Sequence, residues 1–203
     1  MTKATPQQIK KWKERDVSWS QLSSWYYSKE QWANKYIFDK PEPANQAMLF
    51  GNVVGDTLGL PHSMVPKLNP QLIGEKEFKL RVKMGKRILI GFCDHFCPKK
   101  LVLNENKTSQ KANRWTQKEV DNHGQLTMYA LMLNLDYGIR PEAVKMFLNF
   151  IPVIEGQDFQ LRVDTENVKT FATSRTLKQC LMFGAEINKT LKEMELYIKA
   201  QCG

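Results

Sequence analysis

Between residues 75 and 107, the pattern of hydrophobic and polar positions predicts three consecutive β-strands. EKEFKLRV (75–82) alternates polar and apolar residues, as a strand with one buried face does. The turn signal MGKR separates it from ILIGFCD (88–94), a continuous apolar run that suits a central strand buried on both faces. HFCPKK holds a proline and predicts the next turn, after which LVLNENK (101–107) predicts the third strand. We expect the three strands to form a meander.

Helical spacing precedes these strands. Ser18 or Ser20 can cap a first helix, which is expected to end before DKPEP. Its larger side chains are Leu22, Trp25, Tyr26, Trp32 and Tyr36. A second helix is expected from about residue 44 to 60. Its Gly51 and Gly55 indicate the close approach of a neighbouring element, because glycine costs about 1 kcal/mol in a helix interior.

The second half of the chain alternates helical and strand patterns. Residues 116–138 return to helical spacing and end in a glycine, a common helix terminator. AVKMFLNFIPVI (143–154) predicts a buried strand, and DFQLRV (158–163) predicts a short partner for it. From Asp164 the chain is expected to be helical almost to its end, as one helix or two, and Gly184 weakens the case for a single helix.

The order of these elements predicts an α/β fold with a central mixed β-sheet flanked by α-helices. The chain has 203 residues, of which 42% are hydrophobic, enough for one domain with a sizeable core. We expect a single domain over residues 1–203, with a flexible start at 1–17 and a core over 18–200.

Charge indicates the kind of partner. The formal net charge is +9, which favours a polyanion, with nucleic acid first and an anionic membrane surface second. No segment approaches the roughly 18 consecutive apolar residues of a membrane span, so no membrane partner is expected. The N-terminal residues lack the apolar core of a signal peptide, and the four cysteines are too scattered for a disulfide framework, which together predict a cytoplasmic location. CDHFC has three residues between its thiols and no second pair nearby, which makes a zinc site improbable.

Candidate chemistry gathers at the ends of two predicted strands. Asp94 ends the second strand and Glu105 ends the third, so the short turn between them would bring the two carboxylates to one edge of the sheet. Lys107 projects to the same face as Glu105, because strand side chains have a period of two. A hard divalent cation such as Mg²⁺ would reconcile two carboxylates with an ammonium group. The alternative is a surface salt bridge between Glu105 and Lys107, with Asp94 as a turn residue.

The surrounding motifs resemble those of the PD-(D/E)XK nuclease superfamily, and within it the RecB-like exonuclease group. The resemblance covers roughly residues 18 to 130, in order. SWSQLSSWYYSKEQWANKYI is similar to the group's opening helix and FGNVVGD to its glycine-bearing helix. GFCDHF carries G-x-x-D, NENKTS carries (D/E)-x-K-T, and GQLTMYALML carries Q-x-x-x-Y. The resemblance implies a restriction-endonuclease-like core and a deoxyribonuclease, expected to be an exonuclease, that depends on Mg²⁺ or Mn²⁺.

The resemblance also assigns roles to particular residues. It implies that Asp94 and Glu105 hold the metal and that Lys107 is the catalytic lysine. Gln125 and Tyr129, one helical turn apart, would support the site and contact DNA, although a polar residue beside a core tyrosine is the other reading.

Two positions depart from the family's pattern. Gly55 stands where the glycine-bearing helix often has a histidine, and Asp56 after it is either a further metal ligand or an exposed helix acid. Iron–sulfur members carry a cysteine in the opening helix where this chain has Ser28, and the C-terminal half here has only Cys180 and Cys202. No iron–sulfur cluster is therefore expected.

A basic stretch with an aromatic residue follows the third strand. In QKANRWTQK, four residues could form a lip for a DNA strand, with cations on phosphates and a base stacked on the indole: Lys111, Arg114, Trp115 and Lys118. The alternative is a solvated loop whose tryptophan is tucked into the core. His95 and His123 are weaker candidates, expected on the far side of a strand and before the Q-x-x-x-Y helix face.

The hypothesis from the sequence is a metal-dependent DNA hydrolase that acts on single-stranded DNA or duplex ends, in DNA repair, recombination or the processing of phage or mobile-element DNA. The competing hypothesis is a non-catalytic DNA-binding or assembly subunit that keeps the nuclease fold. DNA is the expected partner, and a homo-oligomer or a larger DNA-processing complex is compatible with the sequence.

Overall fold

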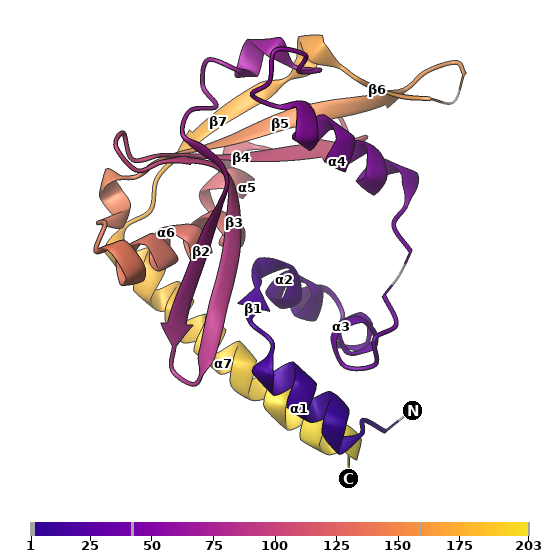
Figure 1. Ribbon diagram of the computed structural model, residues 1–203, viewed down its shortest axis with the longest axis vertical. Coiled ribbons are helices and arrows are strands. Elements are labelled where there is room, and N and C mark those ends of the chain that lie inside the picture. The colour runs from indigo at the N-terminus through magenta and orange to yellow at the C-terminus, as the bar shows by residue number, and fades with distance from the viewer. Residues whose placement is uncertain (1–2, 42, 159, 203) are drawn as a thin grey trace.

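A mixed β-sheet with helices on both of its faces forms the centre of the structure (Figure 1). The structure is a computed structural model and describes residues 3–41, 43–158 and 160–202, with the side chains of 201 and 202 left out. Within these ranges the sheet has seven strands in the order β1-β3-β4-β5-β6, with β2 paired to β3 and β7 paired to β5. The β1–β3 and β4–β5 pairs are parallel and the others are antiparallel.

The N-terminal segment is folded onto the sheet, so the flexible start expected over residues 1–17 is wrong for its described part. Helix α1 spans Pro6–Glu14 and begins with a capping box between Thr5 and Gln8. Trp12 on this helix is 1% exposed and packs edge-on against Trp32 at 5.8 Å between ring centroids. Strand β1 (Val17–Ser18) then pairs with β3, which ties the segment to the sheet.

The opening helix is two helices. Ser18 caps α2 (Trp19–Tyr27) by accepting a hydrogen bond from the backbone N–H of Gln21. Ser28 ends that helix in an extended conformation, with φ −158° and ψ 117°, and its side chain caps α3 (Lys29–Tyr36). The side-chain oxygen of a serine competes with helix continuation in this way, which a hydrophobic pattern does not reveal.

The β2–β3 hairpin is longer than expected. Strand β2 spans Glu75–Met84, and β3 spans Arg87–Cys97, so Asp94 lies inside its strand and not at its end. The HFC segment, expected in a turn, continues the strand because it pairs with the start of β2. The apolar run is also not buried on both faces, since Phe92 is 46% exposed. One face of the hairpin is therefore covered and the other is partly exposed.

Strands β3 and β4 part after a short contact. Strand β4 spans Val102–Ser109 and pairs with β3 only between 95–97 and 102–104. On its other edge, β4 pairs in parallel with β5 (Lys145–Glu155) over its whole length, from Val102 to Ser109. The expected meander is confirmed, but it divides, and the site residues lie where the division begins.

The helical region over residues 116–138 is also divided, into α5 (Gln117–Asp121) and α6 (Gly124–Tyr137). Arg175, 2% exposed, donates hydrogen bonds to the carbonyl oxygens of Val120 and His123 at 2.9 and 3.3 Å, where the two helices meet. Both carbonyls also accept hydrogen bonds from the backbone, at 3.1 Å from His123 and 3.2 Å from Thr127, so the guanidinium adds a further bond to each. Gly138 ends α6 in the left-handed region, with φ 65°, as expected.

The region from Asp164 is not wholly helical as expected. Strand β6 (Leu161–Val163) pairs with β5, and β7 (Lys169–Thr173) then pairs with the other part of β5, after a single turn of 3-10 helix, Thr165–Asn167. Residues 169–173 form a strand and not a helix because they pair with β5, which is distant in the sequence. Helix α7 (Leu177–Cys202) runs unbroken through Gly184, where a Cβ would lie 3.3 Å from Leu131 of α6. The glycine allows two helices to approach and does not end α7.

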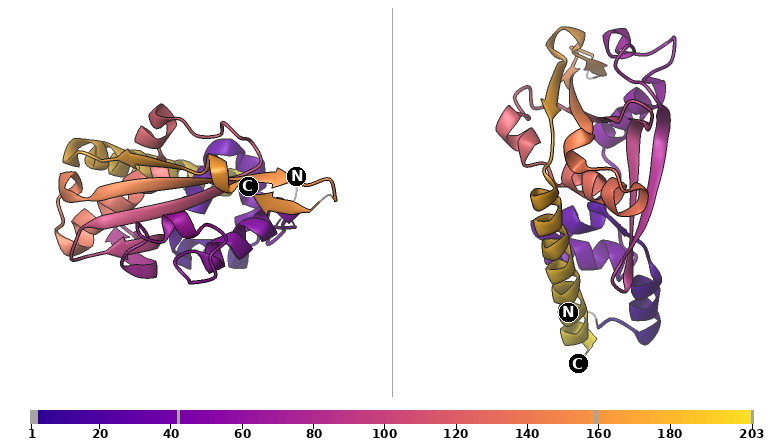
Figure 2. Two further views of the ribbon diagram at one scale, coloured as in Figure 1. Left: turned by 90° about the horizontal axis from the view of Figure 1, so that it is seen from above. Right: turned by 90° about the vertical axis from the view of Figure 1, so that its left-hand side faces the viewer.

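Two apolar cores lie on the two faces of the sheet. Helices α6 and α7 cover one face, and the right-hand view of Figure 2 shows them to the left of the β2–β3 hairpin. The smaller core on the other face lies under α4 (Gln46–Thr57) and the short 3-10 helix Pro66–Leu68. Gly51 of α4 approaches β4, because a Cβ there would lie 2.6 Å from the Thr108 hydroxyl oxygen. Another 3-10 turn, Pro141–Ala143, leads into β5.

Replacement of Trp12 by alanine tests whether α1 belongs to the folded core. The ring is fully buried, and the Arg87 guanidinium lies 4.2 Å from its centroid. We expect Trp12→Ala to lower the free energy of unfolding by about 3–5 kcal/mol in urea titrations, the usual range for a buried tryptophan. The exposed neighbour Lys13 is the control, and Lys13→Ala is expected to change stability by less than about 0.5 kcal/mol. Equal stability of the two variants would contradict the packing of α1.

Candidate functional site

A cavity of about 590 Å³ opens where β3 leaves β4, beneath α4. Asp94 and Lys107 line it from the sheet, and Asp56 lines it from α4. The remaining wall is formed by Met48, Gly51, Asn52, Val54, Gly55, Leu58, Lys76, Glu77, His95, Asn106, Thr108 and Ile151. Lys107 of the E-x-K strand and Asp94 therefore meet at one cavity, through a divided sheet and not through a tight turn, and Glu105 is not among the lining residues.

Asp94 takes the place of a missing backbone partner. Its Oδ2 accepts a hydrogen bond of 2.6 Å from the backbone N–H of Asn106, just beyond the last β3–β4 backbone pair. Burial raises the pKa of the Asp94 carboxyl, while this hydrogen bond and the charge of Lys107 oppose the rise. The carboxylate is thus fixed by the strand that carries Glu105 and Lys107.

Glu105 has one oxygen engaged and one free. The side chain of Lys107 donates to its Oε1 at 2.6 Å, as the period of two predicted. Oε2 is buried and has no hydrogen-bond partner among the described residues. Burial raises the pKa of Glu105 to about 8, although Lys107 opposes this rise. A buried acceptor without a partner is costly, and an added cation would remove that cost.

A chain of hydrogen bonds with a fixed direction holds Lys107. Lys107 donates to Oε1 of Gln125 at 2.8 Å, Nε2 of Gln125 donates to the hydroxyl of Tyr129 at 2.6 Å, and Tyr129 donates to the carbonyl of Phe92 at 2.6 Å. A carbonyl can only accept, so each group in turn has one orientation. The geometry gives the Q-x-x-x-Y pair a support role. Gly91 leaves room for the Tyr129 ring, because a Cβ at this position would lie 2.6 Å from it.

The Lys107 ammonium is kept in its charged form. Burial would lower the pKa of Lys107, but the charge of Glu105 and the hydrogen bond to it raise that pKa above its ordinary value. The contact with Glu105 therefore offsets the effect of burial on Lys107.

A second set of amides reaches Asp94 from the opposite face of β4. Asn149 on β5 is fully buried, and its Nδ2 donates to Oδ1 of Asn106 at 3.0 Å and to Oδ1 of Asn104 at 3.3 Å. The Asn104 Nδ2 donates to the carbonyl of Gln71 at 3.0 Å. The Asn104 Oδ1 is therefore the atom that accepts from Asn149. The Asn106 amide therefore turns its NH₂ away from Asn149, and its side chain also hydrogen-bonds Asp94.

Strand β7 completes this set. The Thr170 hydroxyl donates to Oδ1 of Asn149 at 2.9 Å, so every polar group of that buried amide has a partner. A buried polar set that is fully satisfied gives a rigid, unique arrangement. Sequence analysis missed Asn106 and Asn149, although a lone asparagine inside the apolar run MFLNFIPVI was a readable signal.

The donor set fits a hard divalent cation held by two carboxylates. Carboxylate oxygens with an otherwise unsatisfied position suit Mg²⁺, which takes oxygen ligands and retains several waters. Over the described residues, no three His, Cys, Asp or Glu side chains are close enough to hold an ion together. Asp56 is exposed at the cavity wall, so its part as a third ligand stays a prediction. The prediction that no iron–sulfur cluster is present also stays open, because the side chain of Cys202 lies outside the described residues.

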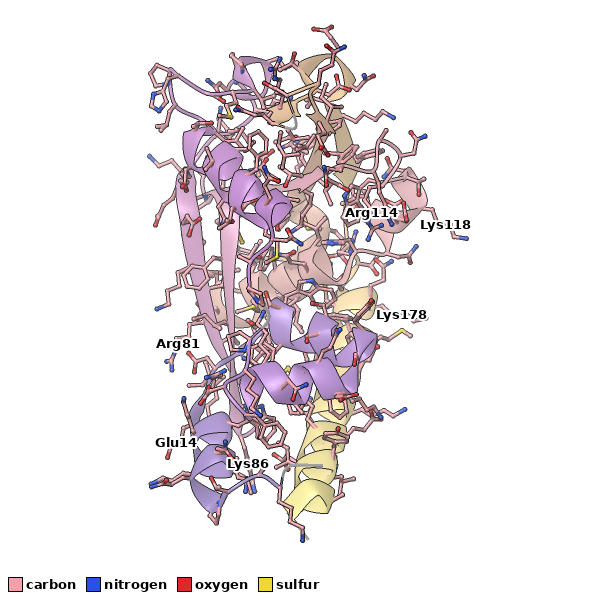
Figure 3. The ribbon with its side chains drawn as sticks, turned by 90° about the vertical axis from the view of Figure 1, so that its right-hand side faces the viewer. Glu14, Arg81, Lys86, Arg114, Lys118 and Lys178 are labelled. Carbon is pink, nitrogen blue, oxygen red and sulfur yellow. The ribbon has the colours of Figure 1, made fainter. Side chains whose placement is uncertain are left out.

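The predicted basic lip lies on the other side of the molecule from the hairpin. In Figure 3, Arg114 and Lys118 project at the right of the view and Arg81 at the left. Arg114 stacks 4.8 Å from the Trp115 ring centroid and lies 3.4 Å from Glu119. Trp115 is half-buried and packs edge-on against His123 at 4.9 Å, so its ring is partly committed to the protein. Lys111 and Lys118 are exposed, and the lip's contact with DNA stays a prediction.

Three further residues line the cavity: Lys76 and Glu77, which the sequence did not single out, and His95, a weaker candidate that was expected on the far side of a strand. Lys76 donates to the backbone carbonyl of Asp56 at 2.8 Å and joins β2 to the end of α4. His95 is buried and lines the cavity, and burial lowers its pKa. Glu77 lies opposite Asp94 with φ 56°, an unusual backbone for glutamate that nothing in its residue type announces.

Comparison with solved structures shows the fold. No protein-family model and no curated protein matches the chain. A phage-related exonuclease from Haemophilus somnus 129PT superposes with a TM-score of 0.60 at 13% identity, over 98% of this chain and 96% of that one. A candidate exonuclease from Eubacterium rectale gives a TM-score of 0.57 at 10% identity, over 100% and 89%. The alkaline exonuclease of Laribacter hongkongensis gives 0.51 at 14% identity, over 97% and 95%.

The α/β architecture predicted from the sequence is confirmed. A mixed seven-stranded sheet flanked by helices, as found in the described ranges, is consistent with a restriction-endonuclease-like fold. No helix in the described part of the chain is both long and apolar enough to cross a membrane.

The buried acid predicts a dependence of stability on pH. Burial raises the pKa of Glu105 from 4.5 to about 8, so between these values the folded chain binds more protons than the unfolded chain. The free energy of unfolding of the metal-free protein should therefore fall as pH rises from about 5 to 8, by up to about 1.4 kcal/mol per unit. Asp94 acts in the same direction. Glu105→Gln should flatten the slope in urea titrations, and an unchanged slope would contradict the burial assigned to Glu105.

Proposed function

We propose that the chain is a divalent-metal-dependent deoxyribonuclease, and an exonuclease, that hydrolyses DNA phosphodiester bonds with a metal-activated water. The observation that carries the proposal is the free, buried Oε2 of Glu105 beside Asp94 and Lys107. A structural salt bridge does not account for this acceptor, because most buried polar groups in proteins have a hydrogen-bond partner. A site prepared for Mg²⁺ or Mn²⁺ accounts for that oxygen.

The likeness to solved structures supports the choice of DNA as substrate and of exonuclease as activity. The fold is shared with proteins described as a phage-related exonuclease and as an alkaline exonuclease, the second also known in complex with dAMP. DNA processing by a phage or mobile element, repair or recombination is the biological setting we infer. The net charge of +9 supports a polyanionic substrate.

In the proposed reaction, Asp94 and Glu105 would hold the ion. The ion, when bound, supplies acidity to a water and positive charge to the phosphate. Lys107 is the catalytic lysine and adds a second, fixed positive charge beside the phosphate, where negative charge develops. Gln125 and Tyr129 keep the ammonium in place, and the amide of Asn106 keeps Asp94 in place. Asp56 would contribute to the metal from α4.

DNA is the proposed partner, as single strands or duplex ends, with the Lys111–Lys118 loop and the Gln125–Tyr129 pair as contact sites. A homo-oligomer or a larger complex is compatible with this proposal. The competing function, a non-catalytic DNA-binding subunit, is disfavoured because the acids and the lysine would then keep a costly buried arrangement without use.

A cleavage assay separates the two functions. End-labelled single-stranded, linear duplex and circular DNAs are incubated with Mg²⁺, with Mn²⁺ or with EDTA. We expect metal-dependent loss of the linear substrates and protection of covalently closed circles, as an exonuclease requires a free end. Asp94→Asn and Glu105→Gln, which keep size while removing charge, should abolish cleavage and retain DNA binding in Ca²⁺. Binding without cleavage by the wild type under all conditions would support the competing function.

Removal of the ammonium gives a separate prediction. Lys107→Met keeps most of the side-chain length and should slow single-turnover cleavage by about 10²- to 10³-fold, the usual effect of losing one placed electrostatic group. Metal affinity, measured by calorimetric titration of Mn²⁺, should hold or rise, because a positive charge near the ion is unfavourable. The charge-keeping Lys107→Arg is the control. A wild-type cleavage rate in Lys107→Met would remove Lys107 from the mechanism.

A further inference from the structure

One face of the β2–β3 hairpin carries a row of cations beside a row of apolar side chains. Lys79, Arg81 and Lys83 alternate along β2 and are exposed. The register places them opposite three residues of β3 in the pairs Lys79↔Phe92, Arg81↔Ile90 and Lys83↔Ile88. We call these six residues the hairpin strip. Paired residues on antiparallel strands share a face, so the strip is continuous.

The strip is turned away from the helical layer. Leu80 and Leu89, on the other face of the hairpin, are fully buried, and Gly91 on that face meets Tyr129 of α6. The right-hand view of Figure 2 shows the hairpin along the right, with α6 and α7 to its left. On the strip itself Phe92 is 46% exposed, and Ile88 and Ile90 are half-buried.

The charges of the strip are largely uncompensated. Arg81 is paired with Asp16 at 2.8 Å. In the described residues, no carboxylate lies within ion-pair distance of Lys79 or Lys83. Lysines on an edge strand can also serve to prevent pairing with other chains. That role explains the lysines of β2, but it does not explain an exposed phenylalanine in the neighbouring strand beside them.

The strip leads to the proposed catalytic site. The next facing pair along the hairpin is Glu77 and Asp94, where the ladder is interrupted and Glu77 has its unusual φ of 56°. Both residues line the cavity. The charge therefore changes from negative at the site to positive at Lys79, within two residues. Alternate strand residues are about 6.8 Å apart, a spacing comparable to that of successive phosphates in an extended strand.

We propose that the hairpin strip binds the single-stranded part of the DNA substrate and directs it to Asp94. This inference rests on the proposed nuclease function and adds the path of the substrate to it. Lys79 and Lys83, four strand residues or about 13.6 Å apart, contact phosphates two apart along the strand, and the Phe92 ring stacks on the base nearest the site. A positive groove with an aromatic platform is the usual means of binding single strands without regard to sequence. The basic lip, on the opposite side of the molecule in Figure 3, is a separate surface.

The test compares two double variants with equal loss of charge. Lys79→Gln/Lys83→Gln changes the strip, and Lys189→Gln/Lys192→Gln changes two exposed lysines of α7. Binding of a fluorescein-labelled oligothymidine of roughly 20 nucleotides is measured in Ca²⁺ and in EDTA at several salt concentrations. The strip variant should lower the slope of log K against log salt by about 1.4, since each single-strand phosphate contact contributes about 0.7. The α7 variant should keep the wild-type slope.

The aromatic part of the strip has its own control. Phe92→Leu keeps an apolar side chain without a ring and should weaken binding on the order of 10-fold, while Phe92→Trp should retain it. A dinucleotide has one phosphodiester and can contact only one of the two lysines, so the strip variant should lose less affinity for it than for the oligothymidine.

Each outcome bears on one claim. Equal slopes for the two double variants, with normal binding by the wild type, would overturn the strip and leave the nuclease proposal standing. A loss confined to blunt duplex DNA would also overturn it, because the strip is assigned to single strands. If the wild type neither binds nor cleaves any DNA, the nuclease proposal itself fails.

Discussion

The hydrogen bond from the backbone N–H of Asn106 to the Asp94 carboxylate is the contact on which the site depends. At this point β4 leaves β3 and continues along β5, so the backbone ladder to β3 is lost. A carboxylate takes the place of a carbonyl at 2.6 Å. A buried N–H without a partner would be costly. The division of the sheet therefore requires an acceptor at this point, and the Asp94 carboxylate is that acceptor. The division also opens the cavity in which the acid lies.

Two directional sets of hydrogen bonds fix the side chains on either side of β4. On the α6 face, Lys107 is tied through Gln125 and Tyr129 to the carbonyl of Phe92. On the other face, Asn149 sets the amide of Asn106 against Asp94. Both sets start at a carbonyl that can only accept, which leaves each group one orientation. Only the Glu105 Oε2 is left without a partner within this arrangement. A preorganised site that lacks a cation would have this pattern.

The sequence was informative where local pattern and side-chain chemistry decide the structure. The three strands, the pairing of Glu105 with Lys107 and the glycine end of α6 follow from period and residue type. The sequence was misleading where a residue or strand that is distant in the chain determines the local structure. Strand β7 pairs along the edge of β5, and Arg175, 52 residues beyond His123, donates hydrogen bonds at the point where the two helices over 116–138 meet. The direction of the amides around Asn149 likewise depends on three strands that are separate in the chain.

The central claim is that the divided sheet prepares Asp94 and Glu105 for a divalent cation, and a crystal structure with Mn²⁺ tests it most directly. The account predicts an anomalous-scattering peak within ligating distance of an Asp94 oxygen and of Glu105 Oε2, with the Asn106 N–H still bonded to Asp94. The remaining positions around the ion should be waters or the Asp56 carboxylate. A peak elsewhere, or an ion that leaves Glu105 Oε2 uncoordinated at saturating Mn²⁺, would contradict the account.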